Sequence, residues 1–146
     1  MNSIPTEAEY LSRLRREVER SINTYVYEVP DDAIGNRMTD AAISDGLAQL
    51  RASLVEPYWT EVEVRDTFEQ VKMDSGPQRK CAVIADDGKG MLLMFDPLEN
   101  SFVLAQWFKA KLITIGVRGD AVGCFLSRSL EVNMSSQVLA IQWELI

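Results

Sequence analysis

The amino-acid sequence predicts an α+β fold, in which two N-terminal helices pack on a curved, mainly antiparallel sheet of about six strands. Two apolar runs, at 81–85 and 91–95, flank the polar segment 86–90, whose two glycines suit the tight reversal of a β-hairpin. A third run, at 101–108, follows a turn that contains a proline, so the sheet continues as a meander. Long stretches with apolar residues at helical spacing occur before residue 55, which places the helices ahead of the strands.

Length and composition indicate one soluble domain that covers residues 1–146. A chain of 146 residues can bury well over half of its unfolded surface, and 47% hydrophobic with 25% charged residues is typical of a globular protein. The longest apolar stretches are about five residues, whereas a membrane-spanning helix needs roughly 20. The first residues carry neither a basic start nor an apolar export segment. We therefore expect a cytoplasmic, bacterial protein with no membrane segment.

The first helix is expected to begin after Thr6. Thr6 and Glu9 form the pattern of a capping box, in which each side chain satisfies an exposed backbone donor of the other residue. Arginine and glutamate residues four positions apart cover one side of this helix, so a solvated face is favoured over an anion-binding site. Apolar residues at spacings of three and four form its buried stripe: Leu11, Leu14, Val18, Ile22 and Tyr25.

A second helix is expected to begin at Thr39 or Asp40, either of which can cap it, and to end at Pro57. Gly46 lies within this helix and would cost about 1 kcal/mol unless a neighbouring element packs closely against it. Beyond the proline, residues 58–65 alternate in polarity, which predicts a strand with one wet face. The buried stripe of the second helix consists of Ile43, Leu47, Leu50 and Leu54.

Two pairs of acidic residues are candidates for catalysis or metal binding, and we favour a structural interpretation of both. Asp31 and Asp32 are adjacent, so their side chains point apart in an extended chain, and no third ligand is suitably spaced. Glu61 and Glu63 would share a strand face about 7 Å apart, within the range that glycosidase carboxylates use. Charges on strands also prevent association between sheets, which is the interpretation we favour.

The rest of the chain is expected to add strands to the sheet. Residues 66–73 fit a short helical turn or an irregular extension. The apolar runs at 112–117 and 121–126 flank a turn, so both are assigned as strands. Alternation at 139–145 predicts a docked C-terminal strand whose removal would destabilise the fold.

The chain lacks the residues on which common catalytic and metal sites depend. Histidine is absent, which removes histidine metal ligands and histidine-activated nucleophiles. Cys81 and Cys124 lie in apolar surroundings, so reduced core thiols are expected rather than a disulfide. No phosphate-loop, dinucleotide or cysteine metal motif occurs. The sequence therefore predicts no catalytic residue, no metal and no cofactor.

Negative charge is concentrated in the N-terminal half. The net charge is −7, and residues 1–78 contain 8 basic and 15 acidic side chains, whereas residues 79–128 contain 7 and 5. This distribution repels a phosphate backbone, so no nucleic acid is expected as a partner. It suits a basic protein partner, although solubility alone also explains a charge of this size.

Several strands are apolar on both faces. The runs 81–85, 91–95 and 112–115 are apolar at consecutive positions, although two helices can cover only one face of the sheet. An uncovered face of this kind would exceed the apolar patch that soluble monomers expose. The second cover is therefore a sheet that curls onto itself, a second subunit, or a partner or apolar ligand.

Three functions follow from these alternatives. The first, which agrees best with the missing catalytic groups, is a non-enzymatic interaction protein that forms a dimer through its sheet and offers its acidic half to a basic partner, as an immunity or adaptor protein would. The second is a small-molecule binding protein with an apolar cavity between the helices and the curved sheet. The candidate lining residues of that cavity are Tyr25, Tyr27, Trp59 and Trp107. The third is a small enzyme that uses aspartate, glutamate or tyrosine in acid–base chemistry.

In general layout the chain is similar to two groups of proteins. It resembles the small α+β proteins of bacterial mobile gene cassettes and toxin–immunity sets, which implies an interaction role. It also resembles the cone-shaped α+β folds in which long helices pack against a bent sheet, some of which bind ligands or catalyse with aspartate and tyrosine. No sequence motif accompanies either likeness.

Overall fold

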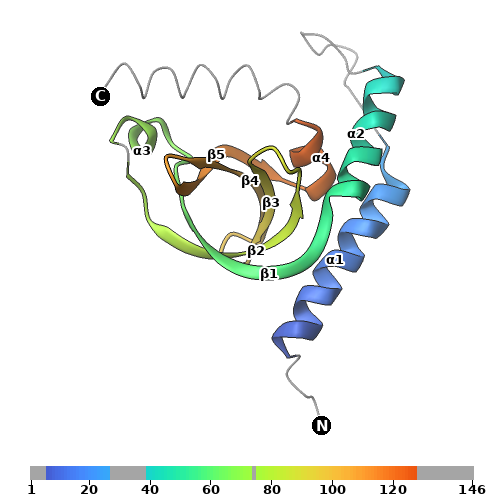
Figure 1. The fold of residues 1–146 in the computed structure, drawn as a ribbon, viewed down its shortest axis with the longest axis horizontal. Helices are drawn as coiled ribbons and strands as arrows, with labels where there is room; N and C mark the ends of the chain where they lie inside the picture. The colour runs from blue at the N-terminus through green and yellow to red at the C-terminus, as the bar shows by residue number, and fades with distance from the viewer. Residues whose placement is uncertain (1–5, 27–38, 74, 128–146) are drawn as a thin grey trace.

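The computed structural model describes residues 6–26, 39–73 and 75–127, which contain four helices and five strands (Figure 1). The α+β class and the mainly antiparallel sheet are confirmed, although the sequence predicts about six strands and the described part of the chain contains five. The elements in chain order are α1 (Glu7–Thr24), α2 (Asp40–Ser53), β1 (Leu54–Glu63), α3 (Phe68–Lys72), β2 (Gln78–Asp86), β3 (Met91–Asp96), β4 (Ser101–Phe108), β5 (Lys111–Gly119) and α4 (Ala121–Leu126).

The five strands form a closed barrel in the order β1–β2–β3–β4–β5. Each strand is antiparallel to its successor, and the barrel closes where β5 runs parallel to β1 at the pair Glu63–Ile113. The hairpin and the meander expected between residues 81 and 108 are confirmed as β2, β3 and β4. In Figure 1 the strands form a ring, and α1, α2 and α4 lie together at one side of it.

The inner face of the barrel has a core of its own. Val83, Met94 and Val103 are paired across three adjacent strands, so their side chains point to the same face, and all three are fully buried. The curled sheet therefore covers one of its two apolar faces by itself. The buried residues of this inner core are Val62, Cys81, Val83, Leu92, Met94, Val103, Ala105 and Leu112.

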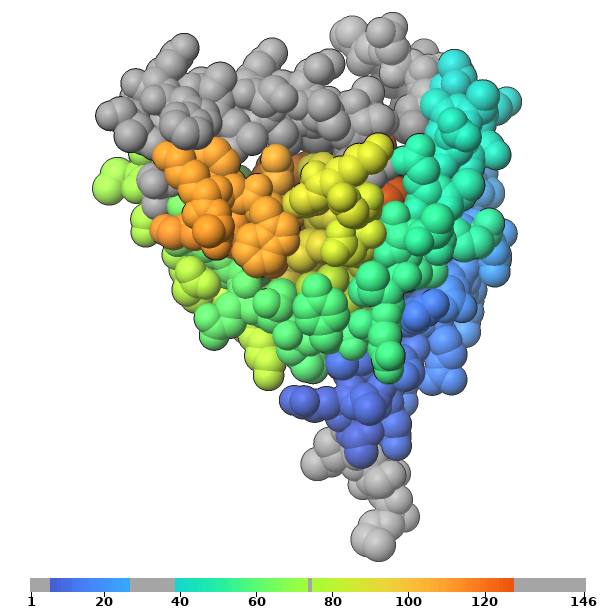
Figure 2. All heavy atoms as spheres, in the orientation of Figure 1, coloured from blue at the N-terminus to red at the C-terminus, as the bar shows by residue number. Residues whose placement is uncertain are grey.

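The outer face of the same strands is covered by helices. Leu93 of β3 is adjacent to Met94, points to the opposite face and is buried among residues of α1, α2 and α4, and Ile115 is half-buried against the same outer core. In Figure 2 the atoms of α1 and α2 form one flank of the molecule beside the barrel. The helices contribute Leu14, Val18, Ile22, Ile43, Leu50, Val122, Phe125 and Leu126 to this outer core. Both apolar faces are thus covered within one chain.

Local signals explain how the long helices begin and how they pack. Thr6 Oγ1 accepts a hydrogen bond from the backbone N–H of Glu9 at 3.1 Å, which confirms the predicted start of α1, and Thr39 caps α2 in the same way. Gly46 of α2 faces α4, where an added Cβ would lie 2.3 Å from a methyl group of Leu126. The absence of a side chain at position 46 therefore allows α2 to pack closely against α4. This close packing explains why a glycine occurs within the helix.

Two element assignments made from the sequence are wrong. Residues 121–126, expected as a strand, form α4, which Asp120 caps by accepting a hydrogen bond from the N–H of Gly123 at 2.8 Å. All of its side chains are buried, and a short helix without a polar stripe cannot be distinguished from a strand by periodicity. The second helix ends at Ser53 rather than at Pro57, which lies within β1. The expected strand at 139–145 lies outside the described residues.

Charged side chains close one end of the barrel. Asp96 is fully buried and accepts hydrogen bonds from Arg79 at 2.8 Å and from Arg118 at 3.0 Å. Arg118 also donates to one carboxylate oxygen of Asp66 at 2.6 Å, and Thr114 donates to the other at 2.7 Å. Burial alone would raise the pKa of Asp96, but the hydrogen bonds from both arginines outweigh it and hold that pKa below its usual value. The charges therefore stay paired where the apolar core ends.

Replacing Asp96 by alanine should lower the free energy of unfolding by about 3 kcal/mol, because two arginines lose their buried acceptor. Urea denaturation of the variant and the parent protein measures the difference. Glu99→Ala is the matched control, since Glu99 reaches Arg79 at 3.4 Å from an exposed position and its removal should cost less than about 1 kcal/mol. Equal losses in the two variants would contradict the assigned role of the buried network.

The same aspartate should make the fold sensitive to acid. Because the pKa of Asp96 is lower in the folded protein than its usual value of 3.8, its ion pairs stabilise the fold fully above that value. This stability is lost as the pH falls through the folded-state pKa, where the carboxylate is protonated. Denaturation measured from neutral pH down to about pH 2 should show the loss, and Asp96→Asn should lack this part of the pH dependence. An identical acid profile in both proteins would be the contrary result.

Candidate functional site

The four aromatic residues considered as cavity lining do not meet at one place in the described structure. Tyr25 is half-buried against the outer core, and Tyr27 lies outside the described residues. Trp59 packs against the outer core, whereas Trp107 pairs with the inward-facing Leu112 and is 53% exposed. Because paired residues share a face, the two tryptophans lie on opposite sides of the barrel wall.

Trp59 joins α1 to the barrel. Its ring stacks on Tyr10 of α1, with ring centroids 5.8 Å apart and planes 10° from parallel. The ammonium group of Lys80 lies 5.5 Å from the centroid of the same ring. The indole Nε1 is buried and has no hydrogen-bond partner among the described residues. These contacts identify Trp59 as a packing residue between helix and strand.

The two glutamates of β1 do not form a catalytic pair. Glu61 is exposed, whereas Glu63 is buried at the end of the strand. Arg65 is also buried, and its Nε donates to the Glu63 carboxylate at 2.6 Å. The carboxylate of Glu63 is therefore engaged in a buried ion pair. Glu61 and Glu63 do not flank a common substrate site. The other acidic pair, Asp31 with Asp32, lies outside the described residues.

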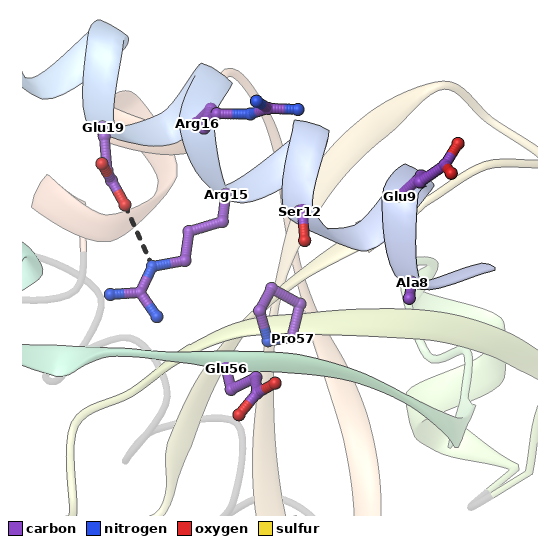
Figure 3. A pocket seen from close by; sticks show the side chains of 8 residues that line it. All are labelled: Ala8, Glu9, Ser12, Arg15, Arg16, Glu19, Glu56 and Pro57. Carbon is purple, nitrogen blue, oxygen red and sulfur yellow. Dashed lines mark hydrogen bonds and ion pairs between the residues drawn. The ribbon is translucent and has the colours of Figure 1, made fainter. Parts of the chain in front are cut away.

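A shallow groove lies between α1 and β1 and is open to solvent (Figure 3). Its volume is about 530 Å³. Figure 3 shows Arg15 reaching from the helix toward the strand, while Glu9 stands nearer the start of the helix, and the ring of Pro57 faces the helix from below. The helix contributes Ala8, Glu9, Ser12, Arg15, Arg16 and Glu19 to the lining, and the strand contributes Glu56 and Pro57.

A β-bulge produces the strand side of this groove. The pairing register of β1 with β2 shifts between Leu54 and Tyr58, so more residues of β1 than of β2 span this stretch. Pro57 lies within the shift and has no amide hydrogen to donate to the ladder, which suits it to a bulge. The carbonyl of Val55, within the same shift, accepts a hydrogen bond from Arg15 Nη1 at 3.2 Å. The strand therefore bends beside α1 and is fastened to it by one arginine.

The groove carries charges of both signs. Arg15 Nε donates to the carboxylate of Glu19 at 3.0 Å, so these two side chains neutralise one another. Glu9, Arg16 and Glu56 are exposed, and their side chains form no hydrogen bond or ion pair with other residues in the described ranges. Figure 3 shows the side chain of Glu56 on the side of β1 away from α1, and the side chains of Glu9 and Arg16 directed away from the strand. These three charges therefore lie around the groove rather than within it.

Neither of the two cysteine thiols lines this groove. Cys81 and Cys124 are buried and form no disulfide, as expected from the sequence. Burial raises the pKa of each thiol to about 12, so neither is a nucleophile near neutral pH. Within residues 6–26, 39–73 and 75–127, no group of three or more side chains is arranged to hold a metal ion.

Sequence reasoning did not find the groove. The sequence predicts a solvated face for the charged side of the first helix and places Pro57 at the end of the second helix. A proline inside an alternating run is the signal that was available, because within sheets proline is confined to edges, strand starts and bulges. The facing position of α1 depends on tertiary packing and has no local signal.

Comparisons with protein-family models, curated proteins and solved structures find no match for this chain. Among the described helices, none has both the length and the apolar character needed to cross a membrane. The function is therefore inferred from the chemistry of the described residues.

Trp59→Ala should lower the free energy of unfolding by about 2 kcal/mol or more, because it removes the ring that joins α1 to the barrel. Thermal or urea unfolding measures the loss. Trp107→Ala is the matched control, because the Trp107 ring is 53% exposed and its removal should change stability by less than about 1 kcal/mol. A larger loss in the Trp107 variant would reverse the roles assigned to the two rings.

Proposed function

We propose that this protein is a non-enzymatic interaction protein, of the immunity or adaptor kind, that binds a protein partner through the groove between α1 and β1. The observation that supports the proposal is the presence around one groove of three exposed charges, on Glu9, Arg16 and Glu56, that no other described residue neutralises. Sites for small molecules are usually enclosed, whereas this groove is open to solvent and five of its eight lining residues are charged. Such a surface suits the polar contacts of a protein–protein interface.

An acid–base enzyme is supported less well. A catalytic centre needs a nucleophile or base held within reach of its orienting group in a cleft. The buried carboxylate of Asp96 is engaged by two arginines, and that of Glu63 by a third. Both thiols are buried and have raised pKa values. The buried groups of the described chain therefore have structural roles.

A small-molecule cavity between the helices and the sheet is also supported less well. Fully buried side chains such as Leu50, Leu93 and Leu104 fill this space in the described structure. The aromatic residues considered as lining are separated, because Trp59 and Trp107 occupy different faces of the barrel. A ligand would have to displace well-packed side chains, which is costly in a close-packed core.

We also propose that the protein self-associates, through a surface other than the sheet face expected from the sequence. The expected dimer depended on a sheet face that two helices could not cover, and the barrel covers that face with its own inner core. The faces of β2, β3 and β4 are therefore occupied within one chain. A dimer, which light scattering would detect, has to use a surface outside these two cores.

Site-specific cross-linking in cells of the source organism tests the proposal. A photoreactive amino acid at Ser12, within the groove, should give a discrete adduct with another protein. The same amino acid at Asp45, an exposed position of α2 outside the groove, is the matched control and should not give that adduct. Adding the substitution Glu56→Lys to the variant that carries the probe at Ser12 should remove the adduct, because it reverses the charge of one residue of the groove. An adduct pattern that is identical at both positions, or no adduct at either, would contradict the proposal.

A further inference from the structure

We draw no further inference here: the strongest candidate, the side-chain cluster of Arg79 and Arg118 around the buried Asp96 at one end of the barrel, carries none because carboxylates of the same chain already neutralise both guanidinium groups and the cluster belongs to the network that closes the barrel.

Discussion

Strands with apolar side chains on both faces need two covers, and this requirement governs the architecture of the protein. The pair Val83 and Met94 faces inward, where the closed barrel surrounds it, and Leu93 faces outward beneath the helices. Each buried aliphatic side chain gains about 1.5–3 kcal/mol, so neither face can remain in water. Curling the sheet into a barrel meets half of the requirement without a second molecule. The helices α1, α2 and α4 meet the other half, which explains why a chain of 146 residues contains two cores.

The polar features of the structure occur where these two cores end. At one end of the barrel, Asp96 and its two arginine partners satisfy charges that would otherwise be buried alone. Beside α1, the bulge around Pro57 bends β1 away from a regular ladder, and Arg15 satisfies a carbonyl in the bulged stretch. The charged groups at the end of the barrel are hydrogen-bonded to one another. The groove beside α1 is flanked by exposed charges that no other described residue neutralises, and for that reason it is the better candidate for recognition.

The features that could be predicted from the sequence have local causes. The cap at Thr6 and the glycine-containing turn between β2 and β3 depend on residues within one turn of chain, and both are confirmed. Closure of the barrel depends on the pairing of Glu63 with Ile113, which are distant in sequence, so a curled sheet was one of three open alternatives. Helix α4 was missed because burial on every side removes its polar stripe. The groove was missed because it needs both a bulge and a helix placed by tertiary packing.

The two cysteines belong to different hydrophobic cores of the same fold. Cys81 belongs to the inner core of the barrel, and Cys124 belongs to the outer core under the helices. A thiol reacts with an alkylating reagent only when it becomes accessible and ionised, so each cysteine is a built-in reporter of one local opening event. Modification of Cys124 would follow the undocking of α4, and modification of Cys81 would follow the parting of the strands. The relative modification rates of the two cysteines would reveal which of the two cores opens to solvent more readily.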